Sequence, residues 1–493
     1  MPRPLRVAAL QPRTFEARDH VRAWEALLAR IDQSIAGHAL LVLPEAAIPG
    51  WALLSRDAAA ALDLPSEDTW FAALAEHCRR TGCAIAAGVV RRDDDGALRN
   101  ELILFGPDGR ELAHAGERTA SGWFTRGRGP AVAEIEGVRI GLIVGRDLAR
   151  RDLIRGLAGV HLLVAAAAPR DTSRLPSAEA SVESDLLTAR AALLGAWAIA
   201  GGKSGSEAGL VRFCGGAGVV DPSGQWSVRA PADQPGIAST EIDVDSAPGP
   251  ALDFATLPAM DAAAASREPL RAAVASREPL RATVAAVAFD PHPSAVESME
   301  RLRALVNAAI AAGARFVVLP DLAGTDPRAV TATETLPFLQ ALTQDSGITL
   351  FASLAERADG ATYKTAYAIE GGQILATHRQ SVLDRDEQTA GFSAGVSPPV
   401  SIRTAFGAVG LMSGAEALAL GAPAGAGVVV WCAGDAAAPV GGTARALAIE
   451  DGVAVVAAGS TSRSGGAFVI DATGRVLAGT PAGEAVLATA RLV

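Results

Sequence analysis

Residues 40–51 read LLVLPEAAIPGW, and residues 316–324 read FVVLPDLAG. A second pair of similar stretches follows in the same order, RIGLIVGRD at residues 139–147 and AVGLMSGAE at residues 408–416. Each first stretch is a short apolar run that ends in Leu-Pro and an acidic residue. Each second stretch is an apolar run that ends in glycine. Two motifs repeated in one order indicate that the chain contains one domain twice.

The correspondence continues to the end of both halves, where GGAGVVDPSG at 215–224 matches GGAFVIDATG at 465–474. The offset between the copies falls from 276 at the LPE and LPD motifs to 250 at this last pair, so the second copy is shortened. Solenoid repeats have periods of only about 20 to 50 residues. This spacing therefore predicts duplicated domains at 1–245 and 282–493.

Residues 246–281 are predicted to form a linker. A decapeptide is written twice there and just beyond, as SREPLRAAVA and then SREPLRATVA. We interpret this repeat as local duplication in an exposed connection that tolerates change, and we attach no chemistry to it.

Within each copy, periodicity predicts alternating strands and helices. LRVAALQP reads as a strand, about residues 20–36 as an amphipathic helix, and ALLVLPE as a buried strand. In the second copy RATVAAVAF, VESMERLRALVNAAIAAG and RFVVLPD repeat that order. Further helices are expected around residues 70–81 and 336–343, each followed by two strands. Such alternation is typical of layered α/β domains.

Composition excludes several classes of protein. The longest apolar runs are shorter than the roughly 20 residues that cross a bilayer, so no membrane span is expected. A net charge of −10 without a basic stripe gives no footprint for nucleic acid. Four cysteines without a regular framework predict reduced thiols, and the N-terminus lacks a signal-peptide pattern, so we expect a cytoplasmic protein. His77, Cys78 and Cys83 lack a second ligand pair, so no metal is expected.

Five ordered motifs carry a resemblance to a known family. They are the LPE strand end with Gly50 and Trp51, NELILFGPDGREL, GWFTRG, RIGLIVGRDL and FCGGAGVVDPSG. In this order they resemble the nitrilase, or carbon-nitrogen hydrolase, superfamily, and the resemblance covers both copies. It implies two tandem nitrilase-like α-β-β-α sandwich domains packed as an intrachain pseudo-dimer. It also implies a Glu, Lys and Cys triad that hydrolyses amides or nitriles.

The carboxylate of this triad maps onto Glu45 in the first copy and Asp321 in the second. Asp321 is one methylene shorter, and a displacement of about 1 Å in a catalytic site can cost on the order of a hundredfold in rate. Only Glu45 keeps the family's residue, as a candidate general base. A structural alternative is a strand-end carboxylate that pairs with a loop or with an arginine such as Arg118.

The lysine of the triad has no counterpart. Aligning the hairpins of the two copies places Glu117 and Gln380 at its position. The adjacent Arg118 and Arg379 are candidate charge partners, although a planar guanidinium is no isostere of an ammonium. The two lysines of the chain, Lys203 and Lys364, both lie outside the expected segment. Lys364 aligns near Asn100, and Lys203 is placed in a late loop.

The cysteine of the triad is replaced by glycine in both copies, Gly145 and Gly414. Ser413 precedes the second glycine, but strand neighbours point to opposite faces, so it is expected to face away. Asp147 and Glu416, two positions beyond the glycines, are expected to be structural. Loss of the nucleophile alone can cost about a millionfold where catalytic groups act as a unit.

The sequence therefore favours a catalytically degenerate protein that binds a partner enzyme or a small amide or carboxylate ligand, without a cofactor. An enzyme of amidase, hydratase or lyase type that uses Glu45 with a non-standard partner remains the alternative. The sequence leaves further homo-oligomerisation open. An open cavity with a cation facing Glu45 would favour the enzyme.

Overall fold

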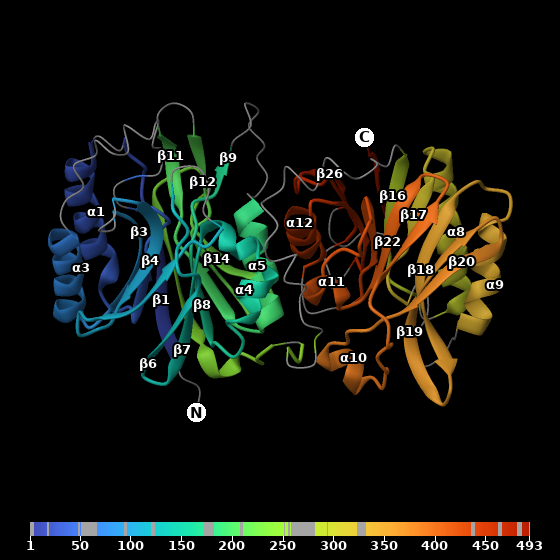
Figure 1. Cartoon of the computed structure of the whole chain (residues 1–493), viewed down its shortest axis with the longest axis horizontal. Coiled ribbons are helices and arrows are strands. Elements are labelled where there is room, and N and C mark those ends of the chain that lie inside the picture. The colour runs from blue at the N-terminus through green and yellow to red at the C-terminus, as the bar shows by residue number, and fades with distance from the viewer. Residues whose placement is uncertain are drawn as a thin grey trace. The chain divides into compact units, whose positions relative to one another are not determined.

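Figure 1 shows a computed structural model of the chain, which divides into two compact units, Met1–Pro250 and Ala251–Val493. The structure describes residues 4–16, 19–47, 50, 67–92, 96–119, 124–171, 182–207, 211–250, 252–254, 257, 282–292, 294–322, 332–434, 439–461, 466–480 and 486–492. Trp51, the start of GWFTRG and the first decapeptide lie outside these residues.

The first unit contains two six-stranded sheets and a smaller one. The first sheet has the order β15 (Gly236–Asp243), β1 (Pro4–Gln11), β2 (Leu40–Val42), β3 (Ala84–Arg92), β4 (Leu98–Phe105) and β5 (Glu111–Gly116). The second has the order β14 (Trp226–Arg229), β13 (Gly218–Val220), β10 (Trp197–Ala200), β8 (Leu162–Ala166), β7 (Val138–Val144) and β6 (Ala131–Ile135). A three-stranded sheet consists of β11 (Lys203–Glu207), β12 (Val211–Gly215) and β9 (Arg170–Asp171).

Helices flank this pair of sheets. On the outer face of the first sheet lie α1 (His20–Ile35) and α3 (Glu67–Thr81). In α1, the residues Trp24, Leu27 and Ile31 recur at helical spacing and are buried against the sheet. The helix α5 (Val182–Leu194) contacts β10 of the second sheet. A separate core, which includes Leu102 and Leu142, lies between the two sheets. The layers are therefore helix, sheet, sheet and helix.

The second unit repeats this plan. Its first sheet has the order β20 (Gln373–Arg379), β19 (Ala361–Glu370), β18 (Thr349–Ala358), β17 (Phe316–Val318), β16 (Thr283–Ala288) and β27 (Val486–Arg491). Its second has the order β21 (Val400–Thr404), β22 (Gly407–Ser413), β23 (Val428–Cys432), β24 (Ala454–Ala458), β25 (Phe468–Ile470) and β26 (Val476–Gly479). The helices are α8 (Ala295–Ala311), α9 (Ala332–Thr343), α10 (Arg385–Thr389), α11 (Glu416–Ala419) and α12 (Val440–Asp451).

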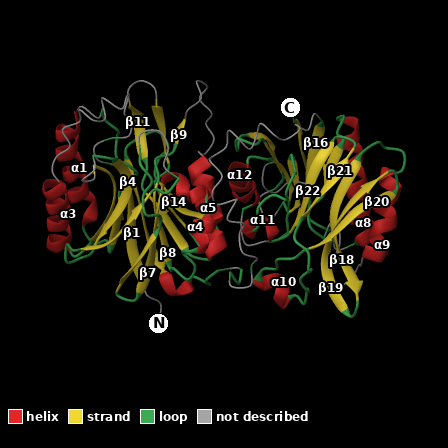
Figure 2. Cartoon of the chain, in the orientation of Figure 1, coloured by secondary structure: helices red, strands yellow, loops and turns green. Residues whose placement is uncertain are grey.

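The strand orders of the two units correspond one to one, which confirms the expected tandem α-β-β-α domains (Figure 2). In both units α-helices cover the outer faces, and one apolar core fills the space between the sheets. The shortening of the second copy lies partly after β24. Where the first copy inserts the hairpin β11–β12 between β10 and β13, a shorter segment joins β24 to β25. Among the described helices, none is both long and apolar enough to span a bilayer.

Candidate functional site

The site in each copy begins where the LPE or LPD strand ends. The amide of Glu45 donates to Ala167 O at 3.2 Å, and the amide of Asp321 donates to Ala433 O at 3.1 Å. In both copies the next residue has a left-handed backbone, with φ of +45° at Ala46 and +50° at Leu322. Non-glycine residues rarely adopt this conformation, and it is typical of constrained functional sites. Both copies therefore turn the chain sharply at the carboxylate.

Backbone hydrogen bonds also show which residues of the two copies correspond at the expected position of the triad lysine. The amide of Glu117 donates to Asn100 O at 2.9 Å, and the amide of Gln380 donates to Lys364 O at 2.8 Å. Glu117 and Gln380 therefore occupy equivalent places, as the hairpin alignment predicted. Lys364 on β19 likewise occupies the place of Asn100 on β4.

The two glycines close the site from the second sheet. Gly145 and Gly414 both have a φ of +49°, at the end of β7 and β22. A Cβ atom at Gly145 would lie 2.8 Å from Glu117 Oε1 and 2.9 Å from Glu45 Oε1. At Gly414 it would lie 2.3 Å from Gln380 Oε1 and 2.6 Å from Glu387 Oε1. The space that a side chain would need is therefore occupied by polar atoms in both copies.

In the first copy the enclosed groups are two carboxylates. Asn100 Nδ2 donates to Glu45 Oε1 at 2.6 Å and to Glu117 Oε2 at 3.1 Å, and the amide of Arg146 donates to Glu117 Oε1 at 3.0 Å. Glu45 is 1% exposed and Glu117 5%. Burial, and then repulsion by Glu45, raise the pKa of Glu117 to about 7. The pair is therefore expected to hold a proton near neutral pH.

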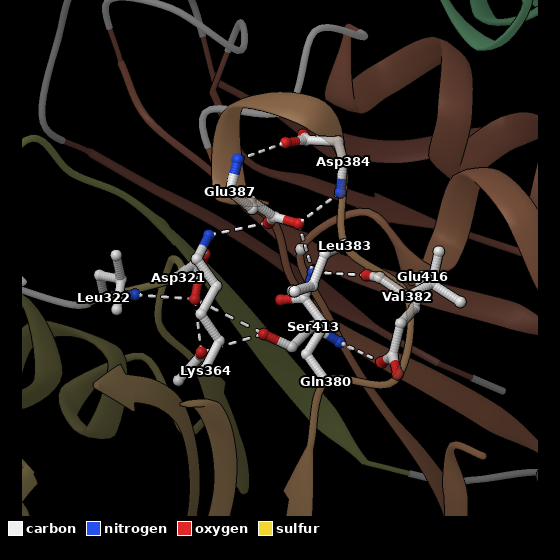
Figure 3. Close-up of polar contacts among 12 residues, drawn as sticks. Asp321, Leu322, Lys364, Gln380, Val382, Leu383, Asp384, Glu387, Ser413 and Glu416 are labelled. Carbon is white, nitrogen blue, oxygen red and sulfur yellow. Dashed lines mark hydrogen bonds and ion pairs between the residues drawn. The ribbon is translucent and has the colours of Figure 1, made fainter. Parts of the chain in front are cut away.

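In the second copy the positive charge beside the carboxylates comes from a lysine (Figure 3). Lys364 Nζ lies 2.5 Å from Asp321 Oδ2 and 2.8 Å from Glu387 Oε1, and all three side chains are at least nine-tenths buried. Burial lowers the pKa of Lys364, but attraction by the two carboxylates outweighs it, so this pKa lies above its ordinary value. The ammonium is thus held in its charged form as an internal counter-ion.

The loop after β20 completes this cluster. Gln380 Nε2 donates to Glu387 Oε2 and to Val382 O, both at 2.7 Å. Glu387 is held by a capping box at the start of α10, in which Asp384 accepts from the amide of Glu387 and Glu387 accepts from the amide of Asp384. Gln380 is therefore a neutral donor to a carboxylate, in the place where the first copy has the acid Glu117.

The shorter Asp321 is accommodated by a serine on the neighbouring strand. Ser353 on β18 and Gly88 on β3 each lie two residues after the residue whose carbonyl accepts from the LPD or LPE strand, so they occupy equivalent positions. The hydroxyl of Ser353 donates to Asp321 Oδ1. A Cβ atom at Gly88 would lie only 2.2 Å from Pro44 O. The first copy thus has a glycine beside Glu45, whereas the second fills that space with a hydroxyl.

Ser413 does not face away from the site, contrary to the expectation from strand alternation. Its hydroxyl donates to Ser353 Oγ at 2.9 Å and lies 3.5 Å from Asp321 Oδ1. The left-handed turn at Gly414 explains the difference, because it redirects the next Cβ position toward the same side as Ser413. Ser413 is completely buried.

Asp147 and Glu416 anchor equivalent loops. Asp147 accepts from the amides of Arg118 and Thr119 at 2.7 and 2.8 Å. Glu416 accepts from the amides of Ser381 and Ser413, and from His378 Nε2 at 2.8 Å. These contacts hold the segment after the lysine position against the second sheet, in agreement with the structural role expected for both acids.

A family model for carbon-nitrogen hydrolases matches residues 6–248 and 283–493 of this chain. The chain belongs to the carbon-nitrogen hydrolase family. The match in two segments agrees with the duplicated fold. No curated protein sequence matches the chain.

The solved structures that are similar to parts of the chain include the following two. An amidase from Nesterenkonia sp. is 24% identical, covers 49% of this chain and 91% of its own, and superposes with a TM-score of 0.42. XC1258 from Xanthomonas campestris, a CN-hydrolase superfamily protein with an arsenic adduct in its active site, is 24% identical. It covers 50% of this chain and 92% of its own, with a TM-score of 0.43. Each structure spans about half of this chain.

The arginines beside the lysine position have other contacts. The amide of Arg118 donates to Asp147, and its side chain lies near Gly129, where Cδ is 3.7 Å from the Cβ position. Arg379 forms a two-pronged ion pair with Glu356, at 2.7 and 3.0 Å, and stacks over Tyr363. Arg379 is therefore engaged on the face of the first sheet, away from the Asp321 cluster.

Lys203 lies in a strand, not in a loop as the sequence suggested. It is the first residue of β11, and its Nζ donates to Ala46 O at 2.8 Å and lies 3.3 Å from Glu207 Oε1. Both lysines of the chain thus contact the segment that ends the LPE or LPD motif. Spacing along the sequence could not show this, because Lys203 and Lys364 reach this segment from other strands. Among the described residues, no three His, Cys, Asp or Glu side chains form a group that could hold a metal ion.

The raised pKa of Glu117 predicts that pH changes the stability of the first unit. A carboxyl with a native pKa of about 7 and an ordinary value of 4.5 binds its proton more tightly when folded. Its stabilising contribution is complete below pH 4.5 and is lost as pH rises through 7. The free energy of unfolding should fall by up to about 1.4 kcal/mol per pH unit in between.

Glu117→Gln should flatten this dependence, because an amide donates as Gln380 does and does not titrate. Urea unfolding followed by tryptophan fluorescence measures it, since six of the seven tryptophans lie in residues 1–250. The exposed Glu134→Gln is the control. Equal pH profiles for wild type and Glu117→Gln would contradict the prediction.

The ion pairs of Lys364 predict a large cost for its removal. Lys364→Met leaves Asp321 and Glu387 buried without a cation, which should destabilise the second unit by about 3–5 kcal/mol. Arg379→Met breaks a partly exposed pair on the adjacent strand and should cost about 1 kcal/mol or less. Hydrogen exchange of β19 and β22 measures both.

Adding Asp321→Asn and Glu387→Gln to Lys364→Met should recover part of the lost protection, because it removes the unpaired charges. If Lys364→Met costs no more than Arg379→Met, the lysine does not act as the internal counter-ion.

Proposed function

We propose that this chain is a catalytically degenerate carbon-nitrogen hydrolase that acts by binding and not by turnover. The observation that carries the proposal is the occupied space at Gly145 and Gly414. There, polar atoms of Glu117 in one copy and of Gln380 and Glu387 in the other lie within 2.9 Å of the Cβ position. A nucleophile needs this space and an approach for a carbonyl carbon.

The charge arrangement supports the same proposal. An amidase of this family needs an ammonium to stabilise an oxyanion, but the corresponding position carries Glu117 or Gln380. The ammonium of Lys364 is the nearest replacement, and two buried carboxylates pair with it. In each copy the polar groups of the site are therefore engaged with one another.

The chain is proposed to serve as a binding partner of another protein or as a receptor for a small ligand. Its family relationship and duplicated fold supply two rigid scaffolds for such a role. Cytoplasmic location is part of the same proposal.

Acid–base catalysis at Glu45 is the second candidate. One observation favours it, the pKa of about 7 at Glu117, which suits a general acid near neutral pH. Against it, both carboxylates are nearly inaccessible, at 1% and 5% exposure.

The proposal predicts that the purified chain does not hydrolyse simple amides through a thiol. Butyramide is a suitable probe, because it is bound in the structure of a cysteine-to-alanine mutant of the Nesterenkonia amidase. Ammonia release should stay at background with or without iodoacetamide. Turnover that iodoacetamide abolishes would overturn the proposal. Turnover that resists iodoacetamide but is lost in Glu45→Gln would favour the second candidate.

The occupied space also predicts a difference between two glycines of similar backbone. Gly414→Ala and Gly371→Ala introduce a methyl group at φ values of +49° and +56°, but only Gly414 has atoms within 4 Å of the Cβ position. Two of those atoms, Gln380 Nε2 and Glu387 Oε1, are held by buried hydrogen bonds. Gly414→Ala should therefore cost about 1–3 kcal/mol more, measured by urea unfolding. Equal costs would show that the cluster yields and that the space is accessible.

A further inference from the structure

A cavity of about 220 Å³ lies in the first unit, apart from the carboxylate pair. It is bounded by the loop after β1, by α1, by Ala47 and by the start of β11. Figure 1 shows these elements in the first unit, with α1 in blue and β11 in green. Glu45 and Glu117 face Gly145 and do not line this cavity, which includes Ala47.

The most buried charged side chain that lines the cavity is that of Lys203. It is 2% exposed. Its Nζ lies 2.8 Å from Ala46 O and 3.3 Å from Glu207 Oε1, both of which are acceptors. Nζ also lies 5.1 Å from the centre of the Phe213 ring. An ammonium has three N–H donors. Lys203 therefore keeps one donor without an acceptor among the described residues, although it is buried in the wall of a cavity.

Two further cations stand at the rim. Arg13 and Arg30 line the cavity, and neither guanidinium has an ion-pair partner within the part of the chain that the structure describes. Glu207 lies beside the cavity and is engaged by Lys203 and by the hydroxyl of Thr14. Among the described residues that line the cavity, three are cations and none is an acid.

Apart from Thr14, whose hydroxyl donates to Glu207, the rest of the wall is apolar. It is formed by Pro12, Phe15, Ala23, Ala26, Leu27 and Ala47. An inorganic anion would have to turn several oxygens toward these side chains, and burial of unpaired polar atoms is unfavourable. An organic anion would bury a compact apolar body there and direct its charged end to the arginines and Lys203.

We propose that this cavity binds a small monocarboxylate with a compact apolar body, such as a short-chain or simple aromatic acid. The inference rests on the proposed binding role and names its ligand class. It places the ligand beside Lys203, and not at the polar groups around Gly145 or Gly414. The hairpin β11–β12 supplies Lys203, and the shorter connection between β24 and β25 provides no such strand among its described residues. Each chain should therefore bind one ligand although its fold is duplicated.

Isothermal titration of the full chain with benzoate tests the proposal. We expect one site per chain, with binding weakened by added salt. Benzamide has the same shape without the charge and should bind at least about tenfold more weakly. Inorganic phosphate has charge without an apolar body and should also bind more weakly. Absence of benzoate binding, or equal binding of all three probes, would overturn the proposal.

Variants locate the site. Arg13→Gln and Arg30→Gln should each weaken benzoate binding by about fivefold or more, because each removes a charge from the rim. Arg22→Gln changes an exposed arginine of α1 that does not line the cavity, and it should have no effect. Ala23→Phe should abolish binding by filling the cavity. Lys203→Met is a poor first test, because Lys203 also holds Ala46 O.

Binding that survives Arg13→Gln, Arg30→Gln and Ala23→Phe would place benzoate elsewhere and refute the proposal. The outcome is independent of the amide assay. If benzoate does not bind and butyramide is not hydrolysed, the ligand class is wrong while the degenerate site stands. If butyramide is hydrolysed through a thiol, the proposed function fails whatever benzoate does.

Discussion

A carboxylate enclosed between two β-sheets must be neutralised within the protein, and this constraint governs the centre of both units. Water cannot solvate Glu45 or Asp321, so each needs a proton, a cation or strong donors close by. The first copy supplies Asn100 and a second acid with a raised pKa. The second copy supplies Lys364. The same backbone thus holds two different solutions to one electrostatic problem.

Each solution involves several residues that change together. Asp321 is shorter than Glu45, and Ser353 fills the space beside it, where the first copy allows only Gly88. Lys364 is matched by Glu387, which the capping box of α10 fixes in place. A single one of these residues placed in the other copy would leave a cavity, a clash or an unpaired charge. The two sites therefore differ as sets and not as isolated substitutions.

Much of the fold could be predicted from the sequence, because repeated motifs and apolar periodicity act over short distances. The duplicated strand order and the equivalence of Glu117 with Gln380 follow from such local patterns. The contact of Lys364 with Asp321 could not be predicted in this way, since it depends on which strands lie side by side. Alternation along β22 gave the wrong side for Ser413 relative to Gly414, because a left-handed turn reverses the pattern there.

The left-handed backbone at Ala46 and Leu322 has a further consequence. Such a conformation costs about 1 kcal/mol or more for a residue with a side chain, and both copies retain it. Contacts that the turn allows offset this cost within each unit, since Ala46 O accepts from Lys203 Nζ and the amide of Leu322 donates to Asp321 Oδ1. The two turns therefore hold in place the carboxylates around which each site is built.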